Sequence, residues 1–304
     1  MDKLYKRNVD FYEIKMKYIE GEPEEPTFEQ LLLDTDLLDG QDLKVKGKLM
    51  SYQLLESDND YVVGLIETSR DENIPPHKDR QKGKVKSLNL PEGDGLAYAN
   101  VFYYDVSRCV ILYEVNKSGS VLDHLFEFLY KKLVKYKKKY SVSSFPILKK
   151  DQYEKLIKMT KTAIEIEVAH PVKVAKEQEE KYSSMFSVFK RAAELDATKL
   201  KVSFSVDARH STLKDLPAND TITEISEYSK LMGADVEHVR VSGYVNDGVD
   251  DKIQKIDLVT DRLTGVIELR EPRQAENLLE NQRLLQIKTV YDNKLEELKS
   301  IFGK

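Results

Sequence analysis

The strongest structural signal in the sequence is a pair of β-rich runs between Leu96 and Val115. The first run, LAYANVFYYDV, and the second, RCVILYEVN, are dense in aromatic and β-branched residues, which favour strands. The two runs meet at Asp105 to Arg108. This pattern predicts an antiparallel β-hairpin, and with it a mostly antiparallel sheet in the first half of the chain.

Other patterns in the first half add strands and helices to that sheet. Further strands are predicted at 8–16, 43–54 and 60–68. A short helix is predicted after Thr27, which can serve as its N-cap. A longer helix is predicted directly after the hairpin because apolar residues recur there at helical spacing, at Val121, Leu125, Phe128, Leu129 and Leu133.

A second half begins after Tyr140. Strands are predicted there at 162–168, 199–206, 236–244, 251–259 and 263–269, with helices at 174–195 and 221–232. The chain ends in a long predicted helix, 272–302, whose apolar seam either covers the second sheet or forms a dimer contact: Leu284, Ile287, Tyr291, Leu295, Leu298 and Phe302. The predicted fold class is α+β, with two subdomains of mostly antiparallel sheet packed with helices, residues 1–145 and 146–304, and a long C-terminal helix.

Composition sets the expected environment of the protein. Hydrophobic residues make up 40% and charged residues 33% of the chain, as in a globular protein with a well-solvated surface. The N-terminal residues lack the apolar segment of a signal peptide, and no apolar stretch is long enough to span a bilayer. The single cysteine, Cys109, lies in an apolar run and is expected to be a buried thiol in a reducing compartment. We therefore expect a cytoplasmic protein without membrane insertion.

Two basic clusters stand out against a formal net charge of -5, which excludes a basic field over the whole molecule. Clusters of this kind can follow a phosphate backbone through counterion release, so they predict sequence-independent binding of nucleic acid, DNA foremost. The loop cluster contains His77, Lys78, Arg80, Lys82, Lys84 and Lys86, and the helix-end cluster contains Lys131, Lys132, Lys135 and Lys138, with further lysines beside them.

Two non-catalytic alternatives remain beside nucleic-acid binding. Lysines at the end of a helix also favour its macrodipole and keep a surface solvated without any ligand. The long C-terminal helix could make the chain a protein-interaction module that self-associates. Neither basic cluster contains a zinc finger or a helix-turn-helix, the motifs that read bases.

The enzymatic alternative is a metal-dependent nuclease. In IDLVTDRLTGVIELR, Asp257 on one predicted strand and Glu268 and Arg270 on the next copy the order of carboxylates that hold a hard cation near a scissile phosphate. Arg270 departs from that order, because a lysine is wanted there and an arginine cannot deprotonate to act as a base. No catalytic residue is therefore assigned, and no phosphate loop, nucleophile elbow or paired-histidine spacing predicts a cofactor or a metal.

One segment resembles a known family. The stretch ANVFYYDVSRCVILYEVNKSGSVLDHLFEFL, with its E-x-N-x-x-G pattern before an apolar helix, is similar to bacterial and prophage phage-exclusion proteins of the RexA and KwaB type, as is KIDLVTDRLTGVIEL before the last helix. The resemblance implies a non-enzymatic, two-domain, homodimeric protein that binds DNA in abortive-infection antiviral defence, with a second defence-system protein as a possible partner. It also implies structural roles for Glu114, Asn116 and Gly119, with Gly119 permitting a tight turn.

Overall fold

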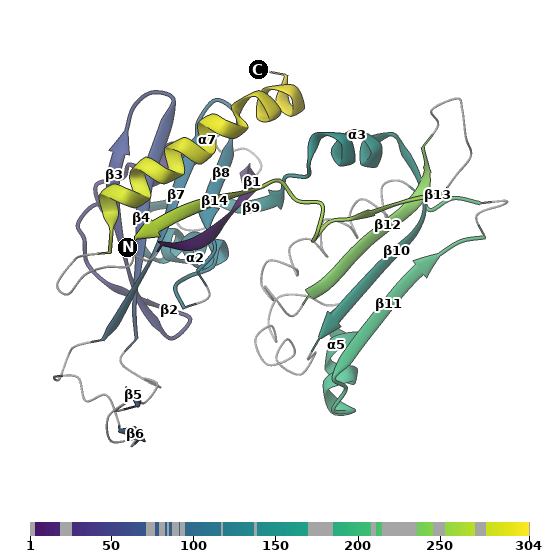
Figure 1. Ribbon diagram of the computed structural model, residues 1–304, viewed down its shortest axis with the longest axis horizontal. Helices are drawn as coiled ribbons and strands as arrows, with labels where there is room; N and C mark the ends of the chain where they lie inside the picture. The colour runs from purple at the N-terminus through teal and green to yellow at the C-terminus, as the bar shows by residue number, and fades with distance from the viewer. Residues whose placement is uncertain are drawn as a thin grey trace. The chain divides into compact units, whose positions relative to one another are not determined.

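The structure is a computed structural model of the 304-residue chain (Figure 1). Two compact units emerge, unit 1 from Met1–Val142 with Thr264–Leu295, and unit 2 from Ser143–Leu263 with Glu296–Lys304. Both combine antiparallel sheet with helices, which confirms the predicted α+β class. The residues that the structure describes are 4–18, 26–70, 77–78, 83, 85–86, 91, 95–116, 118–136, 139–169, 185–207, 211–214, 236–245, 253–270 and 278–303.

The larger sheet lies in unit 1 and has eight strands in the order β14-β1-β8-β7-β4-β3-β2, with β9 also paired to β1. The predicted hairpin is confirmed, since β7 and β8 pair from Phe102↔Tyr113 to Asp105↔Val110. The strand bounds are β1 (Leu4–Tyr18), β2 (Leu43–Val45), β3 (Lys48–Ser57), β4 (Tyr61–Arg70), β7 (Leu96–Asp105), β8 (Val110–Glu114), β9 (Tyr140–Pro146) and β14 (Thr264–Arg270).

Cys109 lies in the tight turn between β7 and β8. The turn leaves its side chain exposed and gives it a φ of 54°, so the expectation of a buried thiol is wrong. A comparable turn interrupts the predicted strand 43–54, because Lys46 and Gly47 both have positive φ values, 48° and 78°. Two consecutive residues with positive φ are the geometry of a two-residue hairpin, and they separate β2 from β3.

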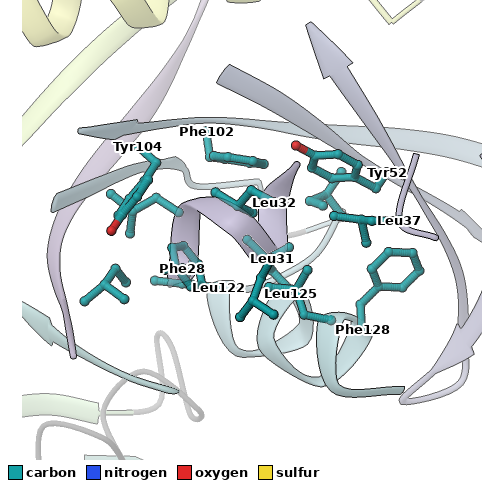
Figure 2. Packing of buried hydrophobic residues seen from close by; sticks show 14 of the residues in the cluster. Phe28, Leu31, Leu32, Leu37, Tyr52, Phe102, Tyr104, Leu122, Leu125 and Phe128 are labelled. Atoms are coloured by element: carbon teal, nitrogen blue, oxygen red, sulfur yellow. The ribbon is translucent and has the colours of Figure 1, made fainter. Parts of the chain in front are cut away.

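Two helices, α1 (Phe28–Leu32) and α2 (Leu122–Lys132), cover one face of the larger sheet. Thr27 caps α1 as predicted, since its hydroxyl accepts from the Gln30 backbone N–H and the Gln30 side chain accepts from the Thr27 N–H. Figure 2 shows the core between them, where side chains of α1 and α2 meet those of β3 and β7: Phe28, Leu31, Leu32, Leu122, Leu125, Phe128, Tyr52, Phe102 and Tyr104. Each of the larger apolar side chains contributes about 1.5–3 kcal/mol by its burial.

The long helix α7 (Glu280–Phe302) covers the other face of the larger sheet with the part that belongs to unit 1 (Figure 1). Successive strand residues point to opposite faces, so Phe102 and Tyr104 face α1 and α2 while Tyr103 faces α7. The Tyr103 ring stacks on that of Tyr291 with centroids 4.3 Å apart, and the Tyr291 hydroxyl donates to Asp105 at 2.7 Å. Burial on both faces explains why β7 and β8 form apolar runs without alternation.

The division of the chain differs from the predicted split into residues 1–145 and 146–304. The first crossing, between Val142 and Ser143, lies close to the predicted boundary, but Thr264–Leu295 returns to unit 1. The cause is the antiparallel pairing of β1 with β14, from Leu4↔Arg270 to Asp10↔Thr264. The seam of α7 as far as Leu295 therefore belongs to unit 1, where Ile287 and Tyr291 are buried, although it was expected to cover the second sheet or to form a dimer contact. The end of the seam, with Leu298 and Phe302, belongs to unit 2.

Unit 2 contains a four-stranded antiparallel sheet in the order β11-β10-β12-β13. Its strands alternate, with apolar residues on the face that forms the core and polar residues on the other, as in β10 where Ile164, Ile166 and Val168 are buried. Tyr153 and Leu156 of α3 pack against this core. The bounds are β10 (Met159–Ala169), β11 (Lys199–Ser205), β12 (Val236–Val245), β13 (Ile253–Asp257), α3 (Lys150–Lys158) and α5 (Met185–Glu194), and the predicted helix 221–232 lies outside the described residues.

Candidate nucleic-acid interface

The helix-end cluster is paired with carboxylates. Lys131 lies 2.7 Å from Glu127, one turn earlier in α2. Lys132 lies 2.8 Å from Asp39. Lys135 lies 2.8 Å from Asp34 and 3.1 Å from Asp36. Of the remaining lysines in this stretch, Lys138 lies outside the described residues and Lys139 makes no ion pair with a described residue.

The carboxylates opposite Lys132 and Lys135 come from the segment that follows α1, about a hundred residues earlier in the chain. Asp34 is only 8% exposed. Burial raises its pKa, but hydrogen bonds from the Lys135 ammonium and from the Asp36 backbone N–H outweigh burial and hold the pKa below its ordinary value. The Lys135 pKa is raised by the same contact. The three described lysines of the prediction are therefore held by fixed negative charge and do not form an open track for phosphates.

The described part of the loop cluster forms a small two-stranded sheet. Strands β5 (His77–Lys78) and β6 (Val85–Lys86) pair antiparallel, with His77 opposite Lys86 and Lys78 opposite Val85. Gly83, between them, has a φ of 66°. Arg80, Lys82 and Lys84 lie outside the described residues. The sequence interpretation as an irregular polar loop missed this pairing, because strands of two residues give no periodic signal.

The residues of the nuclease alternative are divided between the two units. Asp257 ends β13 in unit 2, whereas Glu268 and Arg270 lie on β14 in unit 1. Glu268 pairs with Lys6 at 2.9 Å. Within the described ranges, no group of three or more His, Cys, Asp or Glu side chains is placed to hold a metal ion.

Asp257 instead belongs to an ion network on the polar face of the four-stranded sheet. Its carboxylate lies 2.5 Å from Nδ1 of His238 and 3.6 Å from Nε of Arg240. Arg240 also reaches Glu165 at 3.0 Å, and Lys201 lies 2.8 Å from the same Glu165. These hydrogen bonds, first from Lys201 and then from Arg240, lower the pKa of Glu165 to about 2. Cations and anions alternate across all four strands, so this face carries balanced charge rather than a basic patch.

A buried polar cluster explains the E-x-N-x-x-G pattern. Glu114 is fully buried and accepts from Nε of Arg283 on α7 at 2.9 Å and from the Val101 backbone N–H at 3.1 Å. Asn116 donates to the Ala99 carbonyl at 3.0 Å. Gly119 has no positive φ, but a Cβ there would overlap the amide oxygen of Asn100. A turn closes there as expected, since the Gly119 backbone N–H donates to the Asn116 carbonyl at 3.0 Å, and glycine is required by close packing rather than by a positive φ.

Lys48 and His124 lie in the same neighbourhood and have lowered pKa values. Burial and the nearby Arg70 charge lower the pKa of Lys48 to about 8, and its ammonium contacts the Gly119 carbonyl. Burial, followed by the Lys48 charge, lowers the pKa of His124 to about 4. Both effects follow from tertiary contacts that no spacing in the sequence predicts, and the two groups have the same sign of charge when protonated. Near pH 7, His124 is therefore neutral while Lys48 is mostly protonated.

Comparison with known families gives one match. A family of unknown function, DUF6731, matches residues 42–299, which is most of the chain. The chain belongs to the DUF6731 family. No curated protein matches the sequence.

The DUF6731 match includes both basic clusters and the buried Glu114 and Arg283, and it extends over parts of both units. The RexA and KwaB resemblance stays a prediction, because the family carries no described function. In the described part of this DUF6731 chain, no helix is long and apolar enough to cross a membrane.

Proposed function

We propose that this protein binds duplex DNA through its phosphate backbone, with the loop cluster as the contact surface. The observation that supports this most is the antiparallel pairing of β5 with β6, which brings His77 and Lys78 opposite Lys86 and Val85 in a short two-stranded ribbon. A two-stranded ribbon is one of the elements that the major groove of DNA admits. The residues from 77 to 86 contain five lysines and arginines against one aspartate, Asp79.

Electrostatics supports sequence-independent binding. Each lysine or arginine that neutralises a phosphate releases counterions, which strengthens binding at low salt without reading the bases. A net charge of -5 repels DNA over most of the surface, so binding should be confined to the ribbon and should weaken steeply with salt. The resemblance to phage-exclusion proteins supports antiviral defence as the setting of this binding.

The test compares two triple variants with the same change of net charge. Lys82→Gln, Lys84→Gln and Lys86→Gln remove ammonium groups from the loop cluster, and Lys131→Gln, Lys132→Gln and Lys135→Gln remove them from the helix-end cluster. Affinity for a fluorescein-labelled 30-base-pair duplex is measured by anisotropy at several salt concentrations. We expect the first variant to lose at least about tenfold in affinity, with a salt slope lower by roughly 0.9 for each contact removed. The second should bind within about twofold of wild type, because its lysines are already paired.

A wild-type protein that does not bind the duplex at low salt, or a loop-cluster variant that binds as wild type does, would refute the proposal. A parallel titration with single-stranded DNA and with duplex RNA distinguishes duplex DNA from other polyanions. Equal affinity for all three would agree with electrostatic binding to phosphates. It would contradict binding of the ribbon in the major groove of duplex DNA.

A further inference from the structure

Strand β11 (Lys199–Ser205) is an end strand of the four-stranded sheet, and within the described residues it pairs only with β10. The Val206 backbone N–H donates to the Thr162 carbonyl at 3.0 Å. Residues in an antiparallel pair of strands alternate between hydrogen-bonded and non-hydrogen-bonded positions. This one bond therefore shows which residues of β11 are hydrogen-bonded to β10. The even-numbered residues bond to β10. The odd-numbered residues direct their N–H and C=O groups away from it: Lys199, Lys201, Ser203 and Ser205.

Three other strands at sheet edges are capped at outward N–H groups or are short. On β14, the N–H groups of Glu268 and Arg270 donate to the side-chain oxygens of Gln286 and Gln282 on α7, at 3.2 and 3.1 Å. On β13, the Asp257 N–H donates to the Asp261 carboxylate at 2.9 Å. The β2 edge is only three residues long. No described side chain caps the outward N–H groups of β11, and an open strand of seven residues is a template for pairing with another chain.

We propose that β11 pairs antiparallel with β11 of a second copy, which makes one continuous sheet across a two-fold axis. The odd-numbered residues must form the hydrogen-bonded pairs between the two copies. Pairing over all seven residues of β11 then places Val202 opposite Val202 of the second copy, on the two-fold axis. In this register Lys201 lies opposite the second copy's Ser203, and Lys199 lies opposite its Ser205. Centring the pair on Lys201 would instead place two ammonium groups directly opposite each other, which is unfavourable.

The core face of β11 fits the same register. Leu200 and Val202 pack against the core of unit 2, and Phe204, next on that face, is 42% exposed. Pairing centred on Val202 places Phe204 opposite the second copy's Leu200, at a non-hydrogen-bonded position where cross-strand side chains come closest. The two copies would therefore cover each other's exposed aromatic ring. The lysines on the opposite face stay available to their own partners, since Lys201 pairs with Glu165 within one copy.

The first test measures mass in solution by light scattering on the full chain of 35.1 kDa. Wild type should have twice this mass at tens of micromolar concentration. Ser203→Pro removes one outward N–H and no bond to β10, so it should give a folded monomer by circular dichroism. A monomeric wild type, as expected if another part of the same chain covers the edge, would overturn the proposal. A dimer that Ser203→Pro leaves intact would overturn it as well.

The second test fixes the register by cross-linking. In a Cys109→Ser background, Val202→Cys should give a disulfide-linked dimer on mild oxidation, because the two Cα atoms of such a pair lie about 4.5 Å apart. Ile253→Cys, which is exposed on the opposite edge strand β13, is the matched control and should stay monomeric on a reducing-agent-free gel. Equal cross-linking of the two variants would reflect random collision and would contradict the assigned edge. Neither test involves DNA, so the two proposals can fail separately.

Discussion

The helix-end cluster is the more basic of the two lysine clusters in the sequence, but in the fold its lysines are paired with carboxylates. The helix-end stretch from 131 to 139 contains six lysines and no acid, whereas the loop stretch from 77 to 86 contains five basic residues and one aspartate. Sequence alone therefore ranks the helix end as the stronger site for phosphate. In the fold, the described lysines of the prediction at the helix end each have a carboxylate within 3 Å. The local potential of a basic cluster depends on which elements pack beside it, and not on its own composition.

The largest expected effect is a gain in affinity for DNA when carboxylates beside the helix-end cluster are removed. Asp36→Asn with Asp39→Asn removes exposed acceptors of Lys135 and Lys132 and leaves the buried Asp34 in place. Affinity for duplex DNA at 50 mM salt should rise on the order of tenfold, because Lys132 loses its carboxylate and Lys135 keeps only Asp34, which raises the local positive potential for phosphates. Glu154→Gln with Asp196→Asn changes the net charge equally in unit 2, at residues with no ion pair to a described residue, and serves as the control. Equal gains in both variants would mean that overall charge, not pairing, decides the affinity.

A smaller effect concerns stability. Lys135→Gln removes the cation beside the nearly buried Asp34, and the free energy of unfolding at pH 7 should fall by about 1 kcal/mol, since the ammonium is partly solvated. Lys131→Gln is the control, because its partner lies within the same helix and a pair of this kind contributes only about 0.3–0.5 kcal/mol. Urea unfolding measures both. A fall no larger for Lys135→Gln than for Lys131→Gln would contradict the role given to Asp34.

The same pair predicts a pH dependence. The folded-state pKa of Asp34 is below its ordinary value of 3.8, so the pair adds stability above that value and loses it as the pH falls through the lower, folded pKa. The difference between wild type and Lys135→Gln should therefore shrink below about pH 4. A difference that stays constant down to pH 2 would show that the lysine stabilises the fold by packing alone.

The sequence predicted the individual strands and helices of this fold better than it predicted which of them pair or pack together. The β7–β8 hairpin, the Thr27 cap and helix α2 depend on neighbouring residues, and all are present. The pairing of β1 with β14 joins residues at opposite ends of the chain, and no periodicity encodes it. For that reason the sequence placed β14 and the first part of α7, as far as Leu295, in the second half of the chain, whereas the fold places them in unit 1.

For the candidate site as well, the sequence predicted local features but not contacts between distant residues. Residues 77–86 were identified by charge, but strands of two residues are too short to give a periodic signal. The carboxylates opposite Lys132 and Lys135 come from a segment that only the packing of α1 beside α2 brings near. A buried pair such as Glu114 and Arg283 is likewise 169 residues apart, and each member alone resembles an ordinary surface charge in the sequence.

The most direct measurement of the central claim is a lysine acetylation footprint of the wild-type protein, read by mass spectrometry with and without a 30-base-pair duplex. Binding through the loop cluster predicts that DNA protects Lys82, Lys84 and Lys86 and leaves the acetylation of Lys131, Lys132 and Lys135 unchanged. Protection of the helix-end lysines with no change in the loop would contradict the account.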